Sequence, residues 1–134
     1  MTLDDFNKRY MYVSDRDKFG VSDVWEVLEP NKYGLYEGDC ESYALTIRKL
    51  VPEFSDWELY YCKLSGNGHC VLVKDGYIID CNIKRPVSLT EYHSYFNVTD
   101  YVKYGKFIVF SKLLYTRLVK LKRKIDGFFR SDIK

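Results

Sequence analysis

The dipeptide Asp75-Gly76 constrains the fold more than any other feature of the sequence. It separates two short runs, residues 69–74 and 77–82, that are rich in β-branched and other apolar side chains. Asp-Gly is favoured in a two-residue hairpin because both central residues of a type I′ turn have positive φ. The turn therefore predicts two antiparallel strands in which residue 74 pairs with 77, 72 with 79, 70 with 81 and 69 with 82.

This register sorts the side chains of the hairpin between the two faces of a sheet. Side chains alternate along a strand, so His69 and Asp80 share one face, whereas Cys70 and Cys81 share the other. Diagonal neighbours lie about 7–8 Å apart at Cα, within reach of two polar side chains that lean toward each other. A carboxylate beside a histidine fixes its tautomer and stabilises the imidazolium. A slip of one residue would separate the pair.

A second constraint comes from the stretch 38–51, whose apolar residues recur at helical spacing. They fall on one face of an amphipathic helix: Cys40, Tyr43, Ala44, Ile47, Leu50 and Val51. Asp39 is a favourable N-cap, and Pro52 ends the helix. Cys40 therefore lies in the first turn, where the helix dipole and unpaired backbone N–H groups stabilise a thiolate and can also hold an oxyanion.

Together these features predict a nucleophilic cysteine with a base and an orienting carboxylate. If the His69 face of the hairpin packs on the Cys40 helix, His69 takes the thiol proton, Asp80 orients His69, and the thiolate attacks a carbonyl carbon. Each residue also has a simpler interpretation: a core cysteine, a histidine that caps its strand, and an aspartate that ends a strand in a turn. The shared face of the pair and the helical cysteine upstream favour chemistry.

The rest of the chain predicts further helices and strands around this centre. We expect helices over residues 2–12, from Ser22 to Leu28, over 88–96 and over 113–125, strands over 57–64 and 106–111, and a loop over 65–68. Helices and strands in this order predict an α+β fold in which the cysteine-bearing helix packs on a small antiparallel β-sheet.

The length and composition fit one globular domain, residues 1–134. A chain of 134 residues with 46% apolar and 30% charged residues is long enough for a proper core. No apolar run approaches the roughly 20 residues that span a membrane, and the start lacks the basic and apolar pattern of a signal peptide. We therefore expect a cytoplasmic protein with free thiols at its four cysteines, Cys40, Cys62, Cys70 and Cys81.

Charge is divided unevenly along the chain. Residues 111–134 hold eight Lys or Arg against two Asp, whereas the other 110 residues hold 13 against 17 Asp or Glu. This basic C-terminal segment predicts a helix whose stripe of Leu114, Leu118, Leu121 and Ile125 packs on the core while its Lys and Arg stay in water. On that interpretation nucleic acid is not a partner; the alternative is a patch that binds a polyanion.

Three of these motifs together resemble the bacterial transglutaminase-like cysteine peptidase family. Residues 38–45 (Gly-Asp-Cys-Glu-Ser-Tyr-Ala-Leu), 68–72 (Gly-His-Cys-Val-Leu) and 76–80 (Gly-Tyr-Ile-Ile-Asp) are similar to its cysteine helix, histidine strand and terminal aspartate, in the same order. With an upstream segment the resemblance covers about residues 20–83. It implies a papain-like, transglutaminase-core fold.

The resemblance implies a catalytic triad of Cys40, His69 and Asp80. The chain departs from the family pattern at two nearby positions. Ser42 stands where the family has a second acidic residue, and Cys70 stands where it has a small residue after the histidine. These departures bear on the substrate and on calcium more than on the triad.

The resemblance also suggests roles for residues around the cysteine. The segment 23–25 (Asp-Val-Trp) is similar to an Asp-x-Trp segment of the family, and the indole N–H of Trp25 is our candidate for an oxyanion donor. Its simpler role is packing in the core. Some members bind calcium beside the cysteine, here through Asp39 and Glu41, but N-capping and compensation of the helix dipole are the interpretations we favour.

The sequence thus predicts a cysteine-nucleophile hydrolase or acyl transferase that acts on amide bonds of a protein or peptide. Peptidase, deamidase and transamidase share a thioester intermediate, which water or an amine attacks, and the resemblance favours hydrolysis. Two alternatives stay open: an inactive binding module that uses the basic helix, and a metal site. The metal site would draw on Cys40, Cys62, His69, Cys70 and Cys81. No Cys-x-x-Cys spacing supports it, so we expect neither metal nor cofactor.

Overall fold

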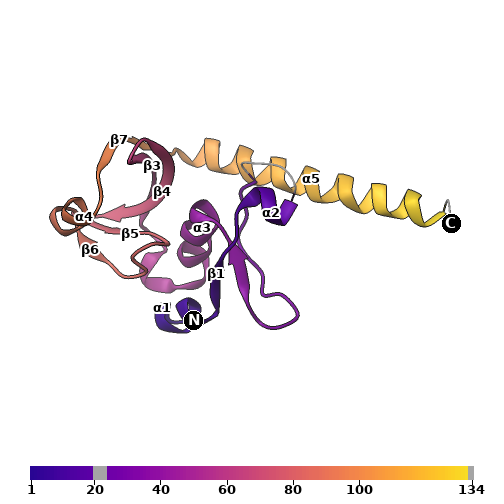
Figure 1. The fold of residues 1–134 in the computed structure, drawn as a ribbon, viewed down its shortest axis with the longest axis horizontal. Helices are drawn as coiled ribbons and strands as arrows, with labels where there is room; N and C mark the ends of the chain where they lie inside the picture. The colour runs from indigo at the N-terminus through magenta and orange to yellow at the C-terminus, as the bar shows by residue number, and fades with distance from the viewer. Residues whose placement is uncertain (20–23, 133–134) are drawn as a thin grey trace.

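The computed structural model describes residues 1–19 and 24–132, with side chains up to position 127. Its elements are α1 (Leu3–Arg9), β1 (Tyr10–Tyr12), α2 (Asp15–Phe19), β2 (Tyr36–Gly38), α3 (Cys40–Leu50), the 3₁₀ helix η1 (Pro52–Phe54), β3 (Glu58–Leu64), β4 (Asn67–Lys74), β5 (Tyr77–Ile79), β6 (Val87–Ser88), α4 (Leu89–Tyr95), β7 (Val98–Lys103) and α5 (Lys106–Asp132). Figure 1 shows α3 near the middle of the molecule and α5 running along one side and past the rest.

The strands confirm the α+β class with a small antiparallel sheet. Five of them pair antiparallel in the order β6-β5-β4-β3-β7, while β1 and β2 form a separate parallel pair. The edge strand β7 pairs with β3 and was not predicted. The predicted strand over 57–64 is confirmed as β3, but residues 67 and 68, predicted as loop, already belong to β4.

The hairpin turn has the backbone that its sequence demands. Asp75 and Gly76 have φ of 50° and 81°, as a type I′ turn requires. The predicted register is confirmed for three pairs, Lys74 with Tyr77, Val73 with Ile78 and Leu72 with Ile79. The three further pairs predicted beyond these do not form, because β5 ends at Ile79 and the chain then turns away, with the Lys84 N–H donating to the Asp80 carbonyl at 2.9 Å.

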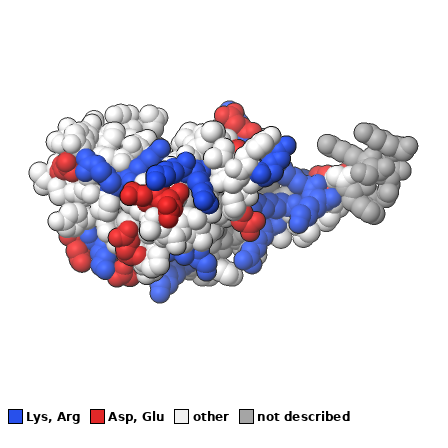
Figure 2. Space-filling model, turned by 90° about the horizontal axis from the view of Figure 1, so that it is seen from below, with Lys and Arg blue, Asp and Glu red and all other residues white. Residues whose placement is uncertain are grey.

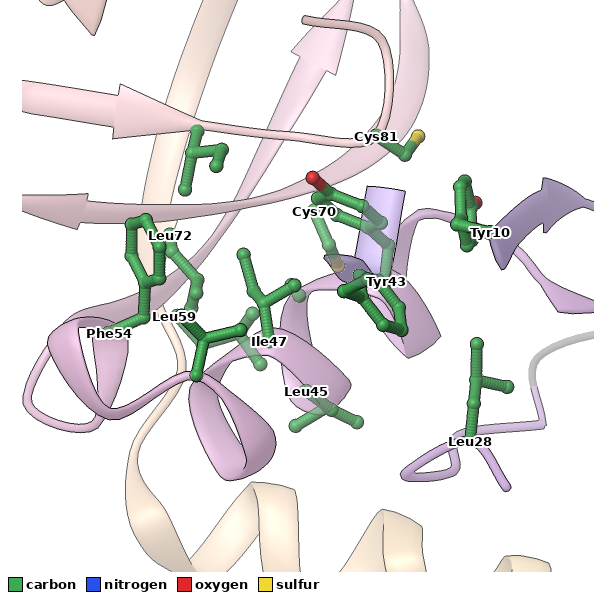
Figure 3. Packing of buried hydrophobic residues seen from close by; sticks show 14 of the residues in the cluster. Tyr10, Leu28, Tyr43, Leu45, Ile47, Phe54, Leu59, Cys70, Leu72 and Cys81 are labelled. Carbon is green, nitrogen blue, oxygen red and sulfur yellow. The ribbon is translucent and has the colours of Figure 1, made fainter. Parts of the chain in front are cut away.

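The sheet separates two cores. On the α3 side, buried residues from the helix and the strands form the larger core, among them Tyr43, Ile47, Leu59, Cys70, Leu72 and Ile79 (Figure 3). On the other side lie Cys62, Val71, Ile78, Val87, Tyr92 and Val98. The cysteine-bearing helix therefore packs on the sheet face that carries Cys70 and Leu72. We expected it on the other face, which carries Val71 and Ile78.

Helix α3 follows its sequence signals closely. The Asp39 carboxylate caps it by accepting from the Ser42 N–H at 3.2 Å, and Pro52 opens η1 just after the helix ends. N-capping by Asp39 is thus confirmed. The Tyr43 ring joins α3 to an aromatic cluster, because its centroid lies 4.8 Å from that of the Tyr10 ring.

The helix expected from Ser22 to Leu28 is wrong over its described part. Ser22 lies outside the described residues, and the chain from Val24 onward is irregular. Tertiary hydrogen bonds replace helical ones here, because the Val24 N–H donates to the Asp15 carboxylate at 2.6 Å and the Leu28 N–H donates to the Thr46 hydroxyl at 2.7 Å. Partners distant in sequence therefore override the local helical pattern.

Two other expectations need correction near the chain ends. The predicted strand over 106–111 is instead the first part of α5, where Val109 packs against the main core. The helix predicted over 2–12 divides into α1 and β1, because Tyr10 pairs with Tyr36 of β2 in parallel register. The helix predicted over 88–96 is confirmed as α4, with Ser88 as its cap.

Gly38, between β2 and the cap of α3, should tolerate no side chain. A Cβ atom there would lie 2.8 Å from a Leu28 methyl group and 2.9 Å from the Ser42 Cβ. We expect Gly38→Ala to lower the free energy of unfolding by about 1–3 kcal/mol through overpacking, measured by denaturant titration.

Gly105→Ala is the matched control, because a Cβ at Gly105 meets no atom within 4 Å. Its free energy of unfolding should stay within about 0.5 kcal/mol of the wild type. Equal stability of the two variants would show that the approach to α3 is not packed as described.

Candidate active site

Cys40 lies at the first position of α3, on a backbone that is held from several sides. The Gly38 carbonyl accepts from the Tyr10 hydroxyl at 2.8 Å and from the Val13 N–H at 3.0 Å. The cap residue Asp39 follows and fixes the first turn. Cys40 itself is half-buried, on a backbone that these contacts fix.

The structure brings His69 and Asp80 into direct contact. The His69 Nε2 and an Asp80 carboxylate oxygen are 2.7 Å apart, and the Asp80 side chain is fully buried. Its second oxygen accepts from the backbone N–H groups of Asn82 and Ile83 at 3.0 and 2.8 Å. The Tyr92 hydroxyl of α4 donates to the same oxygen that meets His69. Four donors thus hold this carboxylate in one orientation.

This contact changes the titration of both partners. Burial alone would lower the pKa of His69, but hydrogen bonds to Asp80 and Cys40 outweigh it and raise the pKa to about 9. Burial alone would raise the pKa of Asp80, but hydrogen bonds from His69 and Tyr92 lower it. At neutral pH the pair is therefore an imidazolium beside a carboxylate.

A second thiol, Cys70, lies beside Cys40. The two sulfurs and a carboxylate oxygen of Glu41 all lie within 4.8 Å of one another. Cys70 alternates with His69 along β4, yet its sulfur lies beside that of Cys40. The α3 helix packs on the Cys70 face, and this packing carries the Cys70 side chain to the helix N-terminus.

The neighbours of Cys40 favour its thiolate. A hydrogen bond from Cys70 is the largest influence that lowers the pKa of Cys40; burial opposes it, and the hydrogen bond and charge of His69 add to it. The same interaction, with burial, raises the pKa of Cys70. Cys70 thus stays protonated and donates, while Cys40 is the thiol that loses its proton more readily.

His69 acts on both Asp80 and Cys40. Its Nε2 meets the Asp80 carboxylate, and its hydrogen bonding and charge also lower the pKa of Cys40. The Cys40 thiol donates to a Glu41 carboxylate oxygen at 3.4 Å. Burial raises the pKa of Glu41 to about 7, which limits repulsion between this carboxylate and the thiolate. The arrangement can therefore generate a thiolate and return a proton through His69.

Acidic groups gather next to the cysteine. Carboxylate oxygens of Asp15, Asp39 and Glu41 lie within 4.8 Å of one another. Burial raises the pKa of Asp39 to about 7, and its carboxylate already caps α3. Oxygen donors of this kind suit calcium, which the resemblance alone implies here.

Two thiols and a carboxylate also offer a donor set that suits zinc. Within the described residues, one cluster of possible metal ligands contains cysteines, and its members are Cys40, Glu41 and Cys70. Cys62 and Cys81 are buried in the two cores instead. The five-residue metal site considered from the sequence is therefore not assembled among the described residues.

Trp25 occupies the main core beneath α5. Its side chain is 1% exposed, its ring meets the Tyr104 ring edge-on at 4.9 Å, and the Lys112 ammonium lies 5.5 Å from its centre. These contacts fit the packing role that we considered for it. The oxyanion role of Trp25 stays a prediction.

Sequence reasoning missed two residues that shape this site, Tyr92 and Cys70. Tyr92 is buried on α4, and nothing in the local pattern linked its hydroxyl to Asp80. Cys70 did leave a signal, since it departs from the small residue that follows the histidine in the resembling family.

A separate cavity of about 550 Å³, lined by Tyr60, Val73, Leu89, Thr90, His93 and Tyr101, shares no residue with the site.

Comparisons with known proteins found no family model that matches the chain, and no curated protein matches it either. The resemblance to transglutaminase-like peptidases therefore stays a prediction. The function has to be argued from the site residues themselves.

Removal of the Cys70 thiol should make Cys40 a weaker nucleophile at mildly acid pH. Cys70→Ala deletes a hydrogen bond to the thiolate, which is worth about 1.5–3 kcal/mol. We therefore expect the midpoint of the pH profile of Cys40 alkylation to rise by about 1–2 units. The rate of modification by iodoacetamide, with the labelled cysteine identified by mass spectrometry, measures this shift.

Cys62→Ala is the matched control, because it removes a buried thiol from the opposite core. Its alkylation profile should follow the wild type. An unchanged midpoint in Cys70→Ala would mean that the second thiol does not stabilise the Cys40 thiolate.

Proposed function

We propose that this protein is a cysteine-nucleophile enzyme that acts on amide bonds, as a transglutaminase-like cysteine peptidase with a papain-like fold. The observation that supports the proposal is the 2.7 Å contact between His69 Nε2 and the buried Asp80 carboxylate, together with the influence of His69 that lowers the pKa of Cys40. A base that is oriented by a third group and acts on a nucleophile is the arrangement that covalent catalysis needs.

In the proposed first step, the Cys40 thiolate attacks the carbonyl carbon of an amide. A C–S bond forms, and the carbonyl oxygen becomes negatively charged. The backbone N–H of Cys40, which has no intrahelical acceptor at the first position of α3, donates to this oxygen. The His69 imidazolium then gives its proton to the amide nitrogen, the C–N bond breaks, and an amine leaves.

The second step releases the acyl group from sulfur. Water attacks the thioester while neutral His69 takes its proton, and the breaking C–S bond restores the thiolate and the imidazolium. An amine in place of water would give transamidation, and a primary amide substrate would give deamidation. Asp80 acts throughout by holding the orientation of His69 and stabilising its charge.

The test of this proposal is amide cleavage by variants at Asp80. A library of fluorogenic peptides supplies the substrate, and Cys40→Ser supplies the inactive reference. Asp80→Asn keeps the shape of the side chain but removes the charge that stabilises the imidazolium. We expect it to lower turnover by about 10²-fold or more while the protein stays folded.

Asp100→Asn is the matched control, since Asp100 is an exposed carboxylate outside the site. It should keep wild-type turnover. Cleavage that persists in Cys40→Ser, or an Asp80→Asn enzyme as fast as Asp100→Asn, would contradict the proposal.

Trp25→Phe tests the second oxyanion donor, because it keeps most of the buried ring and deletes the indole N–H. If Trp25 donates to the oxyanion, turnover on the same substrate should fall by about 10²–10³-fold at unchanged melting temperature. If Trp25 only packs, the melting temperature should fall and the rate should not change. A stable variant with normal turnover would therefore exclude the oxyanion role.

A further inference from the structure

Helix α5 is attached to the body along one face only. Val109 and Thr116 are 7% and 3% exposed, and Leu113 packs against the main core. Farther along, the Lys120 ammonium pairs with a Glu26 carboxylate at 2.7 Å. These four helix positions are spaced by three or four residues, so they lie on one side of α5.

Beyond this attached face, α5 carries an apolar stripe that nothing in the described part of the chain covers. Its members, with their exposed fractions, are Phe107 (80%), Phe110 (63%), Leu114 (46%), Leu118 (57%), Leu121 (54%) and Ile125 (45%). Phe107 and Leu118 lie two residues from the nearest body-facing position, about 200° around the helix, and Phe110, Leu114 and Leu121 lie one residue from one, about 100° around it. Our expectation that the leucine stripe packs on the core is therefore wrong.

Basic side chains flank this stripe. The helix holds eight Lys or Arg against two Asp between residues 106 and 132. Arg117 and Lys124 border the stripe on one side and Lys122 borders it on the other, and all three are exposed. Figure 2 shows Lys and Arg gathered where the helix leaves the body. The exposed face thus combines apolar contact area with positive charge along both edges.

This combination decides between the surfaces that could cover the stripe. A second copy of the helix would bury the stripe but would bring Arg117, Lys122 and Lys124 against like charges, which opposes pairing. A nucleic acid would use the charge and leave the six apolar side chains in water. An anionic lipid surface matches both features, since amphipathic interfacial helices bury apolar residues at the headgroup boundary and place Lys and Arg among phosphates.

We propose that α5 docks this protein on an anionic membrane surface, with the Phe107-to-Ile125 stripe buried at the interface and the flanking Lys and Arg on lipid phosphates. The 27 residues of the helix span about 40 Å, enough to lie along the surface. The body stays on the face of the helix that carries Val109 and Thr116, away from the stripe. No described helix is long and apolar enough to cross a bilayer, and this docking requires none to do so.

The test is sedimentation of the full chain with two kinds of vesicle, phosphatidylcholine alone and phosphatidylcholine mixed with phosphatidylglycerol. We expect binding to the mixed vesicles, weakened by salt, and little binding to the neutral ones. Two double variants separate the contributions. Leu118→Glu with Leu121→Glu places negative charge in the stripe. Arg117→Glu with Lys124→Glu reverses the sign of the charge along one edge of the stripe.

Each double variant should bind mixed vesicles at least about tenfold more weakly. All four positions are exposed, so thermal unfolding should match the wild type. Lys32→Glu with Tyr33→Glu is the matched control, because it makes the same kinds of change at exposed positions in the loop before β2. It should bind as the wild type does.

Three results would overturn the proposal. One is a wild type that binds neither vesicle; another is binding to both vesicle types that no α5 variant weakens. The third is a chain that forms dimers dispersed by the stripe variant, or that retains nucleic acid, while ignoring vesicles. The proposal is independent of catalysis, so Cys40→Ser should bind vesicles like the wild type.

Discussion

The contact between His69 and Asp80 is the interaction on which the site depends. A fully buried carboxylate is costly unless donors surround it, and Asp80 accepts from His69, Tyr92 and two backbone N–H groups. These donors come from β4, from the turn after β5 and from α4, so the charge fixes three segments relative to one another. The same charge holds the pKa of His69 at about 9 and thereby keeps a cation beside Cys40.

The N-terminal half supplies the other part of the site. Tyr10 and Val13 hold the Gly38 carbonyl, Asp39 caps α3, and Cys40 is presented where helical N–H groups stabilise negative charge. The Cys70 thiol completes this environment from the sheet. The hydrogen bond from the Cys70 thiol and the positive charge of His69 both stabilise the Cys40 thiolate. The proposed nucleophile is therefore already ionised before any substrate binds.

Local signals predicted much of this arrangement, and interactions distant in sequence account for the rest. The cap and periodicity of α3, the hairpin turn and the Ser88 cap of α4 act within a few residues, so they were predictable. The irregular Val24–Leu28 segment depends on Asp15 and Thr46, which no pattern connects to it. The run at 106–111 has the composition of a strand, yet it continues the helix of the residues that follow. Cys70 lies in the site because α3 packs on the sheet face opposite to the one that we expected.

The most direct test of the thiolate–imidazolium pair is an NMR titration of the His69 ring. The chain has two histidines, so the His69→Ala variant assigns the signals. A pair predicts that the His69 ring stays protonated until about pH 9, and that Cys40→Ser, which removes the thiolate, lowers its pKa. A ring that titrates near its ordinary pKa of about 6.5 in both proteins would contradict the account.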